Sequence, residues 1–180
     1  MTETRRRIDI IQDPEFLESL AAVPLEELRG RRTMCSDLDV ELSFYRRMIH
    51  GRLDLLAFEL RRRAGEEHQS LLEALPRILS EGAYLSQPGL PARSLSLDVP
   101  DIPSPGRRLV DRALEGDFLA RLPSLDDEEL RQTQAFLDEV EADVSRQRRL
   151  VHDALDVLHR ELTRRYREGL ADSGGLLTSE

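Results

Sequence analysis

The sequence is poor in cysteine, in aromatic residues and in long apolar runs, and each shortage excludes a class of protein. Cys35 is the only cysteine, which excludes an intramolecular disulfide framework and a zinc site built from several cysteines. Aromatic residues make up 4% of the 180 residues and tryptophan is absent. We therefore expect long amphipathic helices with narrow buried stripes instead of a thick globular core. No run of about 18 apolar residues is present, so we expect neither a membrane-spanning helix nor a secretory leader.

The charge balance bears on partners and on location. Acidic residues outnumber basic ones by 35 to 26, and the formal net charge is −9. Because binding to the phosphates of a duplex needs a net basic surface, we expect no direct DNA binding. The lone cysteine fits a reducing compartment, so we expect a cytoplasmic protein that has no membrane partner.

An internal repeat organises the chain. Residues 6–65 align with residues 108–167 without a gap, and 20 of these 60 positions are identical. Two copies are too few for a solenoid, and each copy is too thin to bury its own apolar stripe. The sequence therefore predicts an all-α fold, namely an antiparallel coiled-coil helical hairpin with a pseudo-twofold internal repeat and short flanking helices. We expect one domain, residues 1–180, made of copy one (6–65), a linker (66–107), copy two (108–167) and a flexible tail (170–180).

Apolar residues recur at heptad-like intervals in both copies, which indicates a coiled-coil seam. The seam residues are Leu38, Leu42, Tyr45, Ile49, Leu53, Leu56 and Leu60 in copy one, and Val140, Val144, Val151, Leu155, Leu158 and Leu162 in copy two. Start and stop signals frame two helices of about 40 residues each. These signals are Pro24 and Gly65 for the first helix, and, for the second, Ser124 with Asp126, Asp127 and Glu128 behind it and Gly169 at the far end.

Shorter elements are expected outside the two long helices. The apolar spacing predicts a short helix from Gln69 to Ser80. Asp13-Pro14 and Gly116-Asp117 predict short helical turns before Phe16 and Phe118. Residues 82–107 hold most of the prolines, which indicates a mobile linker or a partner-binding loop.

A second pattern, made of polar residues, flanks the seam in each copy, and we call it the ladder. Its members follow the spacing i, i+4, i+7, i+11, i+15, which keeps them on one side of a helix at about 100° per residue. The ladder residues are Asp39, Ser43, Arg46, His50 and Asp54 in copy one, and Glu141, Ser145, Arg148, His152 and Asp156 in copy two. The recurrence of residue type at each register favours a binding site, and an ordinary solvated face is the alternative.

The ladder chemistry suits a guanine nucleotide. Carboxylates accept hydrogen bonds from the Watson–Crick edge of guanine, and arginine pairs with guanine O6 and N7 or with phosphate. Histidine or arginine also stacks on a purine. Two copies related by a pseudo-twofold axis match a ligand that is itself twofold symmetric, such as a cyclic dinucleotide. Arg47 and Arg149 lie beside the ladder and are secondary candidates, with a plain helix-surface role as the alternative.

The ladder resembles the pattern E-x3-S-x2-R-x3-Q-x3-D, which occurs twice in the RsiG family of actinobacterial anti-sigma factors. Histidine replaces the glutamine of that pattern in both copies, and Asp39 replaces its glutamate in the first. The resemblance implies a protein without enzymatic activity whose ten ladder residues bind cyclic di-GMP, as a bound dimer. It further implies that a sporulation or flagellar sigma factor of the WhiG type is sequestered from core RNA polymerase.

Three other interpretations use the same residues. A coiled-coil adaptor needs only the seam and binds no nucleotide. A metal-binding helical bundle would use the pairs His50/Asp54 and His152/Asp156, but the ladder lies beside the seam and its arginines would repel a cation. A hydrolytic triad of Ser43, His50 and Asp54 is excluded, because one exposed helix face supplies no oxyanion donors.

Other charged residues lie near the ladder. We expect ordinary surface charges at Glu41, Arg47, Arg52, Arg61 and Arg62. The recurring Glu59 and Glu161 are expected to form interhelical salt bridges.

Overall fold

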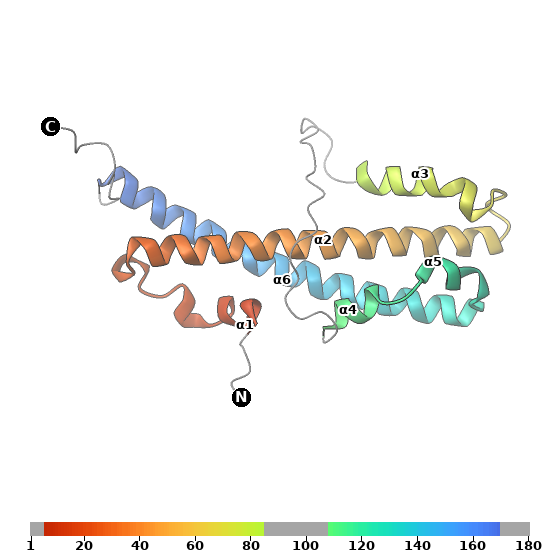
Figure 1. Ribbon diagram of the computed structural model, residues 1–180, viewed down its shortest axis with the longest axis horizontal. Helices are drawn as coiled ribbons and strands as arrows, with labels where there is room; N and C mark the ends of the chain where they lie inside the picture. Colours follow the sequence, from red (N-terminus) through yellow and green to blue (C-terminus); the bar gives the residue numbers. More distant parts are fainter. Residues whose placement is uncertain (1–5, 85–107, 170–180) are drawn as a thin grey trace. The chain divides into compact units, whose positions relative to one another are not determined.

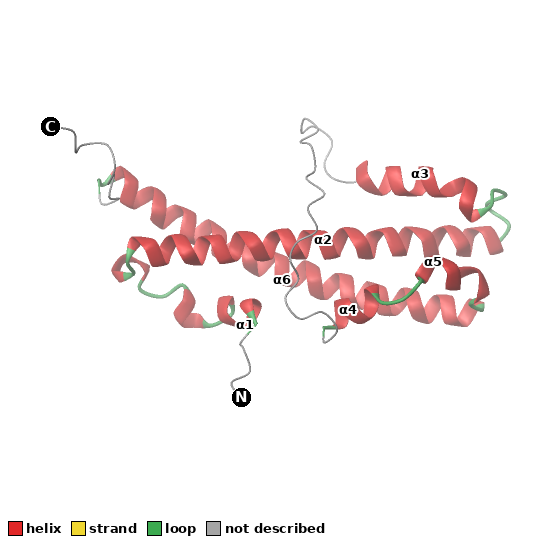
Figure 2. Cartoon of the chain, viewed as in Figure 1, coloured by secondary structure: helices red, strands yellow, loops and turns green. Residues whose placement is uncertain are grey.

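The computed structural model describes residues 6–84 and 108–169 (Figure 1). Within these ranges the chain forms helices and turns and no strand (Figure 2), which confirms the predicted all-α fold. The predicted flexible tail, 170–180, lies outside the described residues, as does the proline-rich segment from residue 85 to residue 107. None of the described helices combines the length and apolar character that crossing a membrane requires.

Short helices and turns accompany two long helices. The helices are α1 (Arg7–Ile11), α2 (Leu25–Arg63), α3 (Leu71–Tyr84), α4 (Leu109–Leu114), α5 (Phe118–Arg121) and α6 (Asp127–Arg167), and the 3-10 turns are η1 (Pro14–Phe16), η2 (Leu20–Ala22) and η3 (Leu122–Ser124). Helix α2 has 39 residues and α6 has 41, close to the predicted lengths. The described residues fall into two compact units: unit 1 holds 6–40 and 146–169, and unit 2 holds 41–84 and 108–145.

Helix α2 begins and ends where the sequence signals predict. The N–H of Leu28 donates to the carbonyl of Pro24 at 3.0 Å, so Pro24 directly precedes the first turn. At the other end Gly65 has φ +79°, a left-handed conformation that glycine adopts without steric cost. The N–H of Gly65 donates to the carbonyl of Arg62, and that of Glu66 to the carbonyl of Arg61. These two bonds form a Schellman motif, which satisfies carbonyls at the helix end.

Helix α6 is capped by Asp126 and not by Ser124. The N–H of Glu129 donates to the Asp126 carboxylate, and the N–H of Asp126 donates to the Glu129 carboxylate, both at 2.8 Å. This reciprocal capping box starts the helix two residues beyond the predicted signal. The Ser124 hydroxyl instead donates to the carbonyl of Arg121 at 2.7 Å, within the preceding turn. Gly169 has φ +67° just past the end of α6, as predicted.

The two long helices run antiparallel within each unit. In unit 2 Arg46 pairs with Glu141, and the later residue Arg63 pairs with the earlier Asp127. In unit 1 Arg29 bonds the Tyr166 hydroxyl, and the later residue Asp39 contacts the earlier His152. Most predicted seam residues are buried, and Leu53, Leu60 and Leu155 are half-buried. The antiparallel coiled-coil seam is therefore confirmed in each unit.

Helix α3 confirms the predicted short helix. Its side chains Ala74 and Ile78 are 1% and 7% exposed. Helix α3 runs beside the C-terminal half of α2 in unit 2 (Figure 1). On α2, Leu55 and Phe58 are also buried, although neither is a predicted seam residue.

The expected surface roles of Glu41 and Arg52 are wrong. Glu41 is 1% exposed and pairs with Arg108, just before α4. Arg52 donates to the carbonyls of Ala113 and Leu114 at 2.6 and 2.7 Å. Its guanidinium also lies 4.9 Å from the centroid of the α5 ring of Phe118. The partners of both residues come from the segment around α4, more than sixty positions away, so neighbour spacing along α2 does not reveal them.

The expected interhelical salt bridges of Glu59 and Glu161 are also wrong. Glu59 accepts hydrogen bonds from Arg62 and Arg63, three and four residues further along α2. Glu161 accepts equivalent bonds from Arg164 and Arg165 on α6. Each carboxylate binds within its own helix because residues three and four apart are neighbours on a helix surface.

Two of these arginines also bond to the segment at the start of the other long helix. In unit 2 Arg63 also binds the α6 carboxylate of Asp127 at 2.9 Å. In unit 1 Arg165 donates to the carbonyls of Leu20 and Val23, in and after η2, at 2.5 and 2.7 Å. Arg63 and Arg165 occupy the same position of the repeat. Each therefore bonds the end of its own long helix to the segment at the start of the other.

Candidate functional site

In unit 2 the structure joins one ladder to the other through the carboxylate of Glu141. Glu141 Oε1 accepts a hydrogen bond from Arg46 Nε at 3.1 Å and lies 3.1 Å from His50 Nε2. The hydroxyl of Ser145 donates to the same oxygen at 2.7 Å. We call these four residues the unit 2 cluster; Arg46 and His50 come from α2, and Glu141 and Ser145 from α6. One acidic oxygen is therefore the meeting point of three ladder side chains.

This environment favours the ionised form of Glu141. Partial burial opposes ionisation, but hydrogen bonds from Ser145, His50 and Arg46 outweigh it and lower the pKa of Glu141. The carboxylate is thus held as an anion between a guanidinium and an imidazole. That arrangement fixes the orientation of both basic side chains.

Unit 1 repeats the arrangement with the two helices exchanged. Asp39 Oδ1, on α2, accepts a hydrogen bond from Arg148 Nε at 3.1 Å and lies 2.7 Å from His152 Nε2. Asp39, Arg148 and His152 form the unit 1 cluster. Ser43, the repeat counterpart of Ser145, is half-buried on α2. The chain therefore holds the same carboxylate–arginine–histidine group twice.

The basic side chains of both clusters are open to solvent. The side chains of Arg46 and His50 are 42% and 36% exposed, and those of Arg148 and His152 are 34% and 45% exposed. Arg46 engages its carboxylate through Nε, and its two terminal amino groups have no partner among the described residues. Those amino groups form a two-donor edge that suits a phosphate or guanine O6 and N7.

Besides Ser43, four predicted residues lie outside the two clusters. Asp54 is half-buried and Asp156 is exposed, and neither makes an ion pair or hydrogen bond with another residue in the described ranges. The secondary candidates Arg47 and Arg149 are both exposed and likewise have no partner in the described part of the chain. The two aspartates add acceptors, and the two arginines add donors, on the solvent-facing side of the long helices.

The pairing of acid with base between the ladders is absent from the sequence interpretation, which treats each ladder as a separate row. One signal could have shown it. When two copies of a repeat pack antiparallel, the start of one row faces the middle of the other, so the leading acid of each row meets the arginine and histidine of its counterpart.

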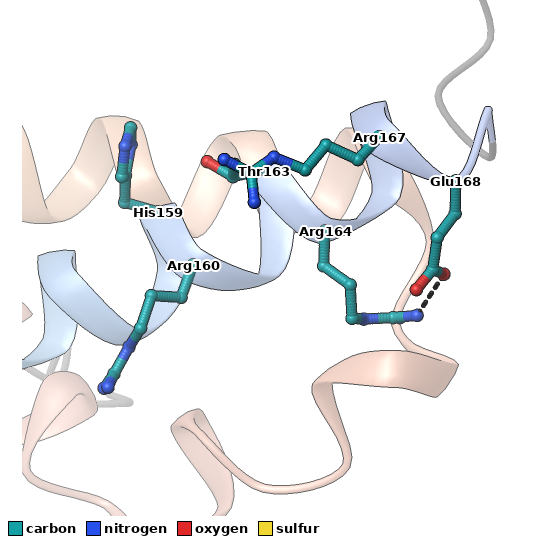
Figure 3. A pocket seen from close by; sticks show the side chains of 6 residues that line it. All are labelled: His159, Arg160, Thr163, Arg164, Arg167 and Glu168. Atoms are coloured by element: carbon teal, nitrogen blue, oxygen red, sulfur yellow. Dashed lines mark hydrogen bonds and ion pairs between the residues drawn. The ribbon is translucent and has the colours of Figure 1, made fainter.

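Outside the two clusters, other features of the described structure are weaker candidates. No group of three or more His, Cys, Asp or Glu side chains within the described ranges could hold a metal ion. A surface hollow on α6 is lined by His159, Arg160, Thr163, Arg164, Arg167 and Glu168 (Figure 3). All six side chains come from one helix, and Arg164 is already paired with Glu168 at 2.5 Å. The two clusters are therefore the strongest candidates.

Comparison with known proteins gives the class of the chain. Residues 14–79 and 116–178 match the RsiG-like family, and both clusters lie inside the matched ranges. The chain belongs to the RsiG-like family. This membership supports a role as an anti-sigma factor with a sigma factor as partner, and thus a regulator and not an enzyme. No curated protein matches the chain.

Proposed function

We propose that this protein binds cyclic di-GMP through the unit 1 and unit 2 clusters and thereby sequesters a WhiG-type sigma factor from core RNA polymerase. One observation carries the proposal. Each unit holds a carboxylate between an arginine and a histidine of the opposite helix, with the two helices exchanged between units. A duplicated site of this kind suits a ligand with two equivalent halves.

The donors and acceptors of the clusters fit the chemistry of this ligand. Cyclic di-GMP carries two guanines and two phosphates. The amino groups of Arg46 can donate to guanine O6 and N7 or to a phosphate, and imidazoles can stack on the bases. The carboxylates of Asp54 and Asp156 are acceptors for the N–H groups of guanine. The ten ladder residues together supply these donors and acceptors, and cyclic di-GMP would bind to them as a dimer.

The proposed activity is occlusion, and no bond is made or broken. A sigma factor held by this protein cannot engage core RNA polymerase, so transcription from its promoters waits. If the nucleotide contributes to the contact with the sigma factor, each strengthens the binding of the other by the same factor. Release would then follow a fall in nucleotide concentration.

The test is a pull-down of the purified protein with a WhiG-type sigma factor, with and without cyclic di-GMP, followed by titration calorimetry. We expect a complex only in the presence of the nucleotide. Complex formation that is indifferent to the nucleotide would contradict the ligand-dependent mechanism while leaving the anti-sigma role in place.

A coiled-coil adaptor without a nucleotide is the second candidate, and one observation favours it. Glu141 and Asp39 already partner the arginine and histidine of each cluster, as they would in self-contained interhelical ion pairs. Alanine at both Arg46 and Arg148 separates the two candidates. Partner binding would survive in an adaptor and would be lost if a nucleotide joins the two proteins.

A further inference from the structure

The hollow on α6 continues the ladder of copy two beyond its last residue. After Asp156, the positions His159, Thr163 and Arg167 follow at intervals of three and four residues. At about 100° per residue these positions stay on the side of α6 that carries the ladder. All three line the hollow (Figure 3), and the hollow and the unit 1 cluster belong to the same unit. A partner that contacts the unit 1 cluster can therefore reach the hollow along one face of one helix.

The hollow holds positive charge that no described residue neutralises. Arg160 and Arg167 are exposed, and neither guanidinium has an ion-pair or hydrogen-bond partner in the described ranges. The third arginine of the hollow, Arg164, pairs with Glu161 and Glu168. We call Arg160 and Arg167 the free arginines. They lie two helical turns apart, and each can bind a carboxylate through two parallel hydrogen bonds.

The matching positions of copy one carry no such charge. The repeat counterparts of the free arginines are Phe58 and Gly65. The basic side chains at that end of α2, namely Arg61, Arg62 and Arg63, are all paired with carboxylates. The ladder recurs in both copies and offers a partner two equivalent orientations, whereas a surface present in one copy selects one of them.

The extent of the hollow indicates which anion it suits. Its lining comes from α6 alone, so none of the described residues forms a second wall around a small anion. Two free arginines neutralise few phosphates of a duplex, and the net charge of −9 opposes a polyanion. Carboxylates fixed on a folded partner suit the hollow better, because the rest of the interface holds them there at a high effective concentration.

The segments of this chain outside the described ranges are weaker occupants. Residues 85–107 hold Asp98 and Asp101 against Arg93 and Arg107, so their side chains carry no net charge. Residues 170–180 are more acidic and hold two carboxylate side chains. The experiment therefore includes this second segment as a competing occupant.

We propose that the hollow docks an acidic segment of the sigma factor, whose carboxylates pair with the two free arginines. Membership of the RsiG-like family supports a sigma factor as the partner, and the hollow lies within the matched range 116–178. Docking at the hollow orients the sigma factor on a ladder that is repeated in both copies. This orienting role rests on the proposed function, in which the ladder binds the nucleotide that joins the two proteins.

The test measures the sigma-factor affinity of full-length variants in the presence of cyclic di-GMP. Arg160→Glu with Arg167→Glu reverses both free arginines. The control, Arg32→Glu with Arg121→Glu, changes the net charge equally at two exposed arginines that have no side-chain partner in the described part of the chain. We expect the first pair to weaken binding by about tenfold at low salt and by less at high salt, and the control to stay within about twofold.

Two further measurements separate charge recognition from a change in the fold or in the nucleotide site. Arg160→Lys with Arg167→Lys should keep most of the sigma-factor affinity, because an ammonium also pairs with a carboxylate. Circular dichroism should show the same helicity in all variants. Direct titration with cyclic di-GMP should give the same result for each variant as for the wild type, since the free arginines lie outside the ladder.

Several outcomes would overturn this proposal. Unchanged affinity in the first pair would do so, and equal weakening by the control would mean that net charge alone matters. Loss of cyclic di-GMP binding in the first pair would assign the hollow to the nucleotide. Duplex DNA that binds the wild type and not the first pair would assign it to a nucleic acid. An equal fall in the melting temperature of the first pair and of Asp172→Asn with Glu180→Gln would assign the hollow to residues 170–180.

Failure of this proposal is distinguishable from failure of the proposed function. If the first pair binds the sigma factor as tightly as the wild type, and both need the nucleotide, only the docking role of the hollow fails. If the nucleotide has no effect and the first pair still weakens binding, the nucleotide-dependent mechanism fails and docking at the hollow stands. A wild type that binds no sigma factor would overturn both.

Discussion

Helices α2 and α6 carry the same residue types along the ladder and differ where each meets the rest of its unit. The ladder residue types recur at each register, and the apolar seam does so except at Tyr45, whose counterpart is Gln147. Arg52 of α2 donates to the carbonyls of Ala113 and Leu114, whereas its counterpart on α6 is Ala154. The comparison teaches that the repeat sets a symmetric inner surface, whereas positions outside it serve contacts that are made only once.

The two clusters use acids of different length. Asp39 is one methylene shorter than Glu141 and contacts Arg148 and His152 at distances similar to those of Glu141 from Arg46 and His50. The shorter acid therefore still spans the gap between the helices. If both clusters bind the same kind of ligand, variants of either should have similar effects.

The largest expected effect is on nucleotide binding. Replacement of both Arg46 and Arg148 by alanine should weaken binding of cyclic di-GMP by several kcal/mol, because each lost charge-assisted bond is worth about 1.5–3 kcal/mol. Helicity should be kept, since alanine is the better helix former. Titration calorimetry and circular dichroism measure the two quantities.

The matched control is Arg47→Ala with Arg149→Ala, at the exposed neighbours of the same helices. We expect a smaller loss, because both neighbours lie outside the clusters. An equal loss of affinity in this control would mean that the nucleotide site includes Arg47 and Arg149 and is not confined to the clusters. If either single variant accounts for the whole effect, the clusters are not equivalent.

The next effect concerns stability and compares two copies of one ion-pair motif. Glu59→Gln should lower the free energy of unfolding by about 1–3 kcal/mol, because the carboxylate is 1% exposed and binds two arginines. Glu161→Gln should cost less, under about 1 kcal/mol, because its carboxylate is 13% exposed. Urea unfolding of the two variants measures the difference, and equal costs would contradict the argument from burial.

The dependence of stability on acidic pH gives a second test of the contribution of Glu161. Hydrogen bonds from Arg164 and Arg165 lower the pKa of Glu161 from 4.5 to about 2. Because the folded state holds the lower pKa, the stability that Glu161 contributes is complete above about pH 4.5 and is lost as the pH falls towards 2. The difference between the wild type and Glu161→Gln should therefore vanish at the acidic end of this range.

A smaller effect is expected from the histidines. If His50 and His152 donate hydrogen bonds to cyclic di-GMP, alanine at both positions should weaken its binding several-fold. The double variant His50→Gln and His152→Gln should keep more of the affinity, because the glutamine amide also donates hydrogen bonds. Titration calorimetry of the two double variants measures the difference. Equal affinities in the wild type and the alanine variant would remove both histidines from the site.

The smallest effect compares the two helix-interior glycines of α2. A Cβ atom at Gly30 meets nothing within 4 Å, as at Gly51. Gly30→Ala should raise the free energy of unfolding by about 0.5–1 kcal/mol and leave sigma-factor binding unchanged. Thermal unfolding and a pull-down measure both properties. A loss of binding in this variant would place the contact with the sigma factor near Gly30.

The elements that the sequence predicts correctly are those that depend on neighbours along the chain. The seam follows from apolar periodicity, and the ends of α2 and α6 at Gly65 and Gly169 follow from the backbone freedom of glycine. The misplaced cap at Ser124 shows the limit of such signals, because several acceptors stand close together before α6. The surface roles expected for Glu41 and Arg52 failed because their partners lie near α4, far along the chain.

For the ladder, too, some properties follow from the sequence and others only from the tertiary structure. Its residue types and their recurrence are properties of the sequence, and so are the two long helices and the repeat that relates them. The tertiary structure alone decided that Glu141 meets Arg46 and His50 and that Asp39 meets Arg148 and His152. The reason is that such pairs depend on the register between two helices, and packing of the seam sets that register where the spacing within either helix cannot.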